Sequence, residues 1–167
     1  LVIPTMKKLF ILIIFIQIAS PVFAQKEANN WALSNYQLDF NAEEPEVSFE
    51  YAEYLNLGLG LISDENGDLL FYSDGYSVWN KNHQLMPNGS EVIPSPEGLT
   101  SRESLVIPHP SDNQLYYLFT VDPWEGFESS GLYYSVIDMT LESGLGDVKS
   151  KGKKILANTS KRITAAL

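Results

Sequence analysis

One short segment offers oxygen ligands at a spacing that could bind a metal ion. Asp64, Asn66 and Asp68 alternate along the chain, as the first ligands of a calcium-binding loop do. No acidic residue follows at the distance at which an EF-hand places its bidentate ligand. The same segment contains Asn66-Gly67, a strong hairpin signal, because both residue types tolerate positive φ. We therefore predict a hairpin turn with solvated acids and no cofactor, and calcium is the alternative.

A second segment combines aromatic and acidic side chains between two predicted strands. Trp124, Glu125, Phe127 and Glu128 lie in a stretch far longer than a tight hairpin. Aromatic faces offer a large contact area and carboxylates accept hydrogen bonds, so these four residues could bind a sugar or a peptide. The alternative is that the two aromatic side chains pack against a neighbouring sheet, as large aromatic residues commonly do.

Catalytic motifs are missing from the sequence. It contains no Gly-x-Ser-x-Gly elbow, no His-Glu-x-x-His and no glycine loop of the phosphate-binding kind. The two histidines, His83 and His109, lie in predicted loops or turns, where a surface or hydrogen-bonded role is expected. Acidic residues are plentiful, but nothing singles out a pair for glycoside hydrolysis. We therefore expect a protein that is not an enzyme.

Composition restricts the partners and the means of stabilisation. The 167 residues include 11 Lys and Arg against 21 Asp and Glu, which gives a formal net charge of −10. Such a surface repels phosphate backbones, so we expect no nucleic-acid partner. The chain has no cysteine, so neither a disulfide framework nor a lipidated cysteine is available, and packing must stabilise the fold.

The first 24 residues have the pattern of a signal peptide with a few upstream residues. Met6–Lys8 is basic, Leu9–Ile18 is almost wholly apolar, and Val22–Ala24 resembles a cleavage site before Gln25. The apolar run is too short to span a bilayer comfortably, so we expect no membrane span after its removal. Export places the protein outside the cell or on the outer cell surface.

Short apolar runs closed by turn residues dominate the rest of the chain and predict an all-β fold. Residues 25–56 are expected to hold an N-terminal strand and an acidic loop that includes Asn41–Glu46, and residues 57–167 the remaining strands. The predicted strands are Trp31–Phe40, Leu57–Ser63, Asp68–Ser73, Tyr76–Asn80, Ser104–Pro108, Gln114–Asp122, Gly131–Met139 and Lys153–Ala157, with another beginning at Lys161–Leu167.

Two of these units resemble each other. Leu70–Asp74 aligns with Leu118–Asp122 at an offset of 48 residues, a spacing typical of β-propeller blades. Leu115–Val121 is apolar on both sides, as expected of a strand buried on both faces. We therefore predict a partial propeller-like array of four-stranded antiparallel sheets, about two to three blades, after the signal peptide. Because the pattern stops within an apolar run, we expect the N-terminal fragment of a longer protein.

Several sequence blocks together carry a resemblance to a known family. The blocks are Glu27–Trp31, Leu38–Asn41, Ile62–Asp64, Asn66–Gly75, Val78–Asn80, His83–Gly89, Leu115–Asp122, Tyr133–Met139 and Gly144–Val148. They resemble the N-terminal region of large secreted Bacteroidetes proteins. Those proteins carry PKD or other immunoglobulin-like modules and end in a gliding-motility-associated, type IX secretion sorting domain. The segment 43–55 departs from the small polar residues expected there, and no sorting domain is present in this sequence.

The resemblance implies export by Sec, passage through the outer membrane and a propeller-like domain without an assigned biochemical role. Together with the missing catalytic motifs, it predicts a secreted or cell-surface binding or scaffold domain whose partner is an extracellular glycan or protein. The alternative is a piece of a carbohydrate-active propeller enzyme in which further blades supply the catalytic acids. A third interpretation is a fragment without a function of its own. The sequence indicates no oligomeric state.

Overall fold

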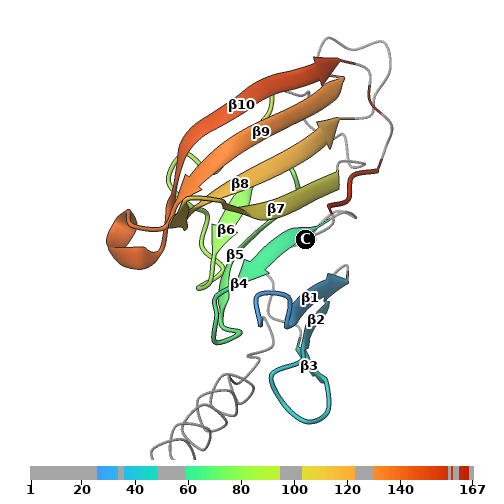
Figure 1. The fold of residues 1–167 in the computed structure, drawn as a ribbon, viewed down its shortest axis with the longest axis vertical. Coiled ribbons are helices and arrows are strands. Elements are labelled where there is room, and N and C mark those ends of the chain that lie inside the picture. Colours follow the sequence, from blue (N-terminus) through green and yellow to red (C-terminus); the bar gives the residue numbers. More distant parts are fainter. Residues whose placement is uncertain are drawn as a thin grey trace, which may run out of the picture.

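The computed structural model describes residues 26–33, 36–48, 59–94, 103–122, 130–157, 159 and 162–165. These residues form an all-β structure whose ten strands are arranged in three antiparallel sheets, none of them closed (Figure 1). The expected signal peptide lies outside the described residues. None of the helices among the described residues has the length and apolar character needed to cross a membrane.

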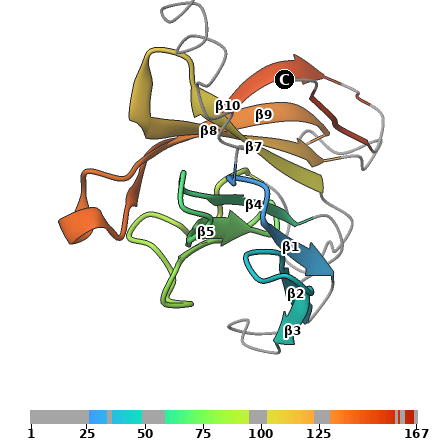
Figure 2. The same ribbon diagram turned by 60° about the horizontal axis from the view of Figure 1, so that its bottom comes forward.

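Each sheet consists of strands that follow one another along the chain. The middle sheet lies between the N-terminal and the C-terminal sheet (Figures 1 and 2). The N-terminal sheet comprises β1 (Asn30–Leu33), β2 (Tyr36–Asp39) and β3 (Glu46–Ser48), and the middle sheet comprises β4 (Gly60–Ser63), β5 (Leu69–Ser73) and β6 (Val78–Asn80). The C-terminal sheet has β7 (Glu103–His109), β8 (Asp112–Asp122), β9 (Gly131–Asp138) and β10 (Asp147–Ala157), with a short 3₁₀ turn η1 (Glu142–Gly144) before β10.

Most predicted strands are confirmed, and the exceptions have local causes. The segment 31–40, predicted as one strand, forms β1 and β2, which pair antiparallel with Leu33 opposite Tyr36. Strand β10 begins at Asp147 rather than at the predicted Lys153. The prediction was too short because Gly152 adopts a φ of 66° and the register is irregular, which obscures the alternation of side chains. Glu46, predicted in a loop, begins β3. Among the described residues, only the C-terminal sheet has the expected four strands.

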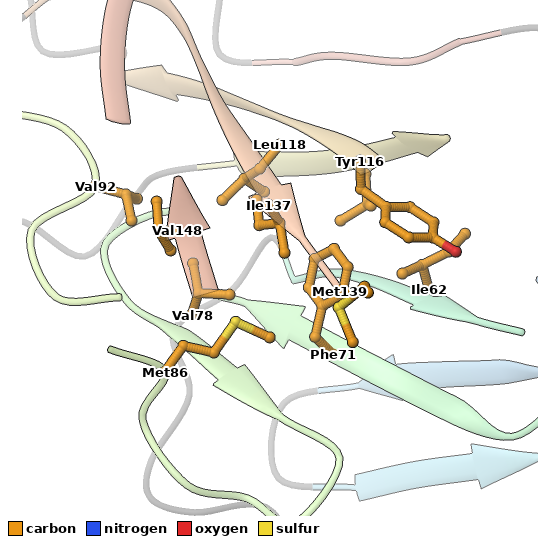
Figure 3. Close-up of a cluster of buried hydrophobic side chains, with 11 residues drawn as sticks. Ile62, Phe71, Val78, Met86, Val92, Tyr116, Leu118, Ile137, Met139 and Val148 are labelled. Carbon is orange, nitrogen blue, oxygen red and sulfur yellow. The ribbon is translucent and has the colours of Figure 1, made fainter. Parts of the chain in front are cut away.

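The middle and C-terminal sheets share one hydrophobic core (Figure 3). Phe71 of β5 is fully buried, and its ring lies 5.4 Å from that of Tyr116 on β8 in an edge-on orientation. Strands alone do not close this core, because Met86, Val92 and Met139 from connecting segments also belong to it. Packing between sheets therefore provides the stabilisation that disulfides cannot.

Buried polar contacts connect the sheets at their first strands, β1, β4 and β7. The Ser104 hydroxyl of β7 accepts the N–H of Gly60 at 2.7 Å and donates to the carbonyl of Ser73 at 2.8 Å. A Cβ at Gly60 would lie 3.0 Å from Ser104, a tight contact, so glycine favours this close approach of β4 to β7. On the other side of β4, the amide of Asn30 donates to the Ser63 hydroxyl at 2.9 Å.

The outer face of the C-terminal sheet, opposite the core, carries a half-buried aromatic cluster. Phe119 and Tyr134 are paired across β8 and β9, and their rings lie 6.4 Å apart. Tyr117 lies 6.1 Å from Phe119 and 5.9 Å from Tyr134, and the Lys153 ammonium lies 5.7 Å from the Tyr134 ring. The segment Leu115–Val121 is therefore apolar on both faces for two reasons. One face lies in the core, and the other belongs to this aromatic cluster.

The Asp138 carboxylate at the end of β9 accepts hydrogen bonds that make the stability of the fold depend on pH. The Thr140 hydroxyl donates to Asp138 Oδ1 at 2.6 Å, and the Lys149 ammonium donates to Oδ2 at 2.9 Å. These contacts, the first of them foremost, lower the pKa of Asp138 to about 2. Because the pKa is lower in the folded than in the unfolded chain, the stabilisation is present above about pH 4 and is lost as the pH falls towards 2.

We expect Thr140→Val to raise the pKa of Asp138 towards its ordinary value of 3.8, because the hydroxyl donor is removed. NMR titration of the side-chain carboxyl carbons measures this pKa directly. Thr140→Ser keeps a hydroxyl and serves as the matched control, in which the pKa remains near 2. Identical titration curves for the Val and Ser variants would contradict the assignment of the hydroxyl as the main cause.

Candidate functional site

The predicted hairpin turn forms between β4 and β5, and one carboxylate oxygen organises it. Asp64 Oδ1 accepts the backbone N–H groups of Asn66 at 2.8 Å and of Asp68 at 3.0 Å. The N–H of Gly67 donates to the Asp64 carbonyl at 3.0 Å. Only Gly67 adopts a positive φ, at 92°, so the turn does not use the positive φ that the sequence motif allows at Asn66.

The three candidate calcium ligands are therefore close in sequence but differ in their surroundings. Asp64 is half-buried and bonded to the backbone of its own turn, whereas Asn66 and Asp68 are exposed. In the part of the chain that the structure describes, no group of three or more His, Cys, Asp and Glu side chains could hold a metal ion. The geometry accounts for these residues as elements of a turn.

The aromatic and acidic segment that contains Trp124, Glu125, Phe127 and Glu128 lies outside the described residues. The structure places its two ends, because β8 ends at Asp122 and β9 begins at Gly131, and these two residues are paired. The segment therefore connects neighbouring strands at one end of the C-terminal sheet.

Both histidines take part in structural contacts. The Tyr72 hydroxyl and His83 Nδ1 form a hydrogen bond of 3.2 Å. His109 Nδ1 accepts the N–H of Ser111 at 3.2 Å, and its ring lies 5.1 Å from that of Tyr117. These contacts confirm the hydrogen-bonded role expected from the sequence.

A cavity with a volume of about 460 Å³ lies where the three first strands meet. We call it the first-strand pocket. Among its described residues the lining is mostly aliphatic, and Trp31, which is 53% exposed, is the one aromatic residue. The described lining residues are Glu27, Ala28, Asn30, Trp31 and Ala32 at β1, Leu59, Gly60, Leu61 and Ile62 at β4, Ser104, Leu105, Val106, Ile107 and Pro108 of β7, and Ala165.

Polar groups at one side of the first-strand pocket hold the N-terminal sheet against β4. Asn30 is buried, and its amide donates to the Gly67 carbonyl at 2.7 Å and to the Ser63 hydroxyl at 2.9 Å. The backbone N–H of Ser63 donates to the Glu27 carbonyl at 3.1 Å. The β1 wall of the pocket is thus fixed by hydrogen bonds between residues far apart in sequence.

A second cavity of about 350 Å³ lies beside the β4–β5 turn and has a more polar lining. It includes Glu27, Asp64 and Tyr116, and Glu27 also lines the first-strand pocket. Burial, followed by the nearby carboxylates of Asp64 and Glu27, raises the pKa of the Tyr116 phenol. Among the described residues, no donor bonds the buried Oε2 atom of Glu27.

Sequence reasoning did not identify Glu27, Asn30 or Ser104 as site residues. Glu27 and Asn30 belong to a short polar lead-in, and Ser104 is a single hydroxyl at the start of an apolar strand. No motif marks them, because their roles arise from contacts between sheets. The contact of Asn30 with Gly67 spans 37 positions, and that of Gly60 with Ser104 spans 44.

Comparison of the sequence with protein-family models and with curated proteins, and of the fold with solved structures, gave no significant match. The first-strand pocket and the sheets that form it therefore provide the basis for assigning a function.

Proposed function

We propose that this protein is an exported, non-enzymatic binding domain whose ligand occupies the first-strand pocket. The observation that carries the proposal is the position of this cavity of about 460 Å³, which residues of β1, β4 and β7 line together. Cavities of this size with an apolar lining and a few polar groups are typical of ligand sites. The ligand is an extracellular glycan or protein, and the domain is part of a larger secreted or surface-displayed scaffold.

The arrangement of the sheets supports a propeller-like architecture for this domain. Strand β4 lies against β1 on one side and β7 on the other, so the first strands of successive sheets are neighbours (Figure 2). In a propeller, the first strand of each blade lies nearest the central axis. The first-strand pocket then corresponds to the central channel.

The internal repeat gives independent support. Leu70–Asp74 covers most of β5, and Leu118–Asp122 is the last part of β8, so both belong to the second strand of their sheet. The alignment pairs Phe71, which faces the C-terminal sheet, with Phe119 in the outer aromatic cluster. If Phe119 has the same role as Phe71, a further sheet packs on the outer face of the C-terminal sheet. That face is then not a ligand site, so we place the ligand in the first-strand pocket.

The neighbourhood of β7 agrees with this architecture. The backbone N–H of Ile163 donates to Glu103 Oε2 at 3.3 Å, and Ala165 lines the first-strand pocket. Residues 162–165 have no regular secondary structure, and these two contacts place them near the start of β7 and the pocket. The strand predicted to begin at residues 161–167 is therefore not found in the described residues 162–165.

Filling the pocket tests the proposal. We expect Ala28→Trp to reduce ligand binding at least about tenfold, because exposed Ala28 lines the cavity and an indole would occupy much of it. Glycan arrays and pulldowns of extracellular proteins, using the secreted chain, identify the ligand, and a titration of that ligand measures the loss.

The matched control is Ala157→Trp, which places the same side chain on an exposed residue of β10. Equal binding by both variants would exclude the pocket as the site. If the chain hydrolyses a polysaccharide, and substitution of one carboxylate residue abolishes that hydrolysis, the enzymatic alternative would replace the binding function.

A further inference from the structure

Most polar side chains among the described residues that line the first-strand pocket are already hydrogen-bonded within the protein. Asn30 donates two hydrogen bonds through its amide and accepts one through its Oδ1. The Ser104 hydroxyl both accepts a backbone N–H and donates to a backbone carbonyl. The indole N–H of Trp31 donates to the carbonyl of Ala28 at 3.0 Å. These three side chains therefore serve the fold first and have little capacity left for a ligand.

Glu27 is the exception in this lining. The residue is half-buried, its Oε2 atom is buried, and no donor among the described residues bonds that atom. Its backbone is held in place, because the carbonyl of Glu27 accepts the N–H of Ser63 at 3.1 Å. A carboxylate oxygen that is removed from water without a hydrogen-bond partner is unfavourable. A donor brought by a ligand would satisfy this atom.

The surroundings of Glu27 favour a donor that carries a positive charge. Asp64 and Glu65 line the second cavity together with Glu27, and none of the described lining residues of either cavity is basic. The chain as a whole has a formal net charge of −10. Acidic surroundings attract a cation and repel an anion, so a cationic donor suits Glu27 better than a neutral one.

The rest of the described lining favours an aliphatic group next to that cation. Leu61, Leu105 and Ile107 are half-buried, so part of their apolar surface is open to a ligand. Lysine and arginine side chains combine an aliphatic stem, which packs on apolar surface, with a charged head that donates hydrogen bonds. A basic side chain therefore matches both the aliphatic part of the lining and its one unpartnered carboxylate.

We propose that the first-strand pocket binds a basic side chain of a protein ligand, with its aliphatic stem against the aliphatic lining and its cationic head on Glu27. This deepens the proposed function, on which it rests, by naming a protein rather than a glycan as the ligand. Glu27 is the residue that selects the basic side chain. The volume of about 460 Å³ also leaves room for apolar residues beside the basic one.

The probe is a capped peptide, acetyl-Ala-Leu-Lys-Leu-Ala-amide, whose only charge is the lysine ammonium group. It is titrated into the secreted chain, and the shifts of the backbone amides in NMR spectra give the affinity. A matched peptide carries norleucine in place of lysine, which keeps the aliphatic stem and removes the charge. We expect the lysine peptide to bind at least about tenfold more tightly, because its head forms a charge-assisted hydrogen bond. A salt concentration of about 0.3 M suppresses general attraction to the acidic chain.

Two variants with the same change of net charge map the preference for lysine to Glu27. In the Glu27→Gln chain the two peptides should bind with affinities within about twofold of each other, because the uncharged amide no longer selects the ammonium group. Glu65→Gln is the matched control, since Glu65 is an exposed acid of the second cavity, and it should keep the preference for lysine. Ala28→Trp should weaken both peptides, and circular dichroism verifies that each variant is folded.

A preference for the lysine peptide that survives in the Glu27→Gln chain would overturn the proposal, and so would an equal loss of preference in the Glu65→Gln chain. If both peptides bind alike and Ala28→Trp weakens both, the basic side chain is excluded while the proposed binding function stands. No saturable binding of the lysine peptide would also overturn the inference. If the glycan and protein screens then find no ligand that depends on the pocket, the proposed function fails as well.

Discussion

Replacement of Phe71 by alanine is expected to lower the free energy of unfolding by about 3–5 kcal/mol. Phe71 is 0% exposed and lies between the middle and C-terminal sheets, with its ring 5.4 Å from Tyr116 (Figure 3). Truncation would remove the contacts that join the two sheets and leave a cavity that neighbouring side chains fill only partly. Urea denaturation, followed by far-ultraviolet circular dichroism, measures the loss.

Phe40→Ala provides the matched control for this prediction. Phe40 follows β2, is 37% exposed and contacts Trp31 at a ring distance of 5.2 Å. Its truncation should cost about 1 kcal/mol, because much of its surface already faces water. Similar losses for the two variants would show that the middle and C-terminal sheets do not share a common core.

The second large effect is expected for Asn30→Ala, which should destabilise the chain by about 2–3 kcal/mol. Asn30 is 4% exposed, and its amide donates to Ser63 and to the Gly67 carbonyl. Its Oδ1 accepts the Gln37 amide at 2.6 Å. Alanine would remove the donor to the Ser63 hydroxyl and the acceptor of the Gln37 amide, whereas the Gly67 carbonyl would keep its hydrogen bond from the Asn41 amide. The attachment of the N-terminal sheet to β4, and with it one wall of the first-strand pocket, would be weakened.

Asn29→Ala is the control, because the Asn29 amide bonds Asn41 in an exposed contact of 2.9 Å. We expect a cost below about 1 kcal/mol for it. Urea denaturation gives both stabilities, and amide hydrogen exchange of β1 reports whether the N-terminal sheet has separated. Unchanged exchange in the Asn30→Ala chain would contradict a positioning role for this residue.

The secondary structure was predictable from local patterns to a large extent. Short apolar runs closed by Asp, Asn and Gly identified β4 to β9, because strand and turn preferences act over a few residues. The Asn66-Gly67 turn was also visible, since Gly67 supplies the positive φ that the turn requires. Strand β10 was predicted too short, because the bulge at Gly152 interrupts the alternation from which strands are recognised.

The sequence by itself determined an all-β chain of consecutive antiparallel strands with a repeat that relates β5 to β8. Only the tertiary structure decided which polar residues are buried and where the cavity lies. Asn30 meets Ser63 and Gly67 across 33 and 37 positions, and Ser104 meets Ser73 and Gly60 across 31 and 44. Local propensity carries no information about such contacts, because they depend on how whole sheets pack, and the first-strand pocket exists only where three strand edges converge.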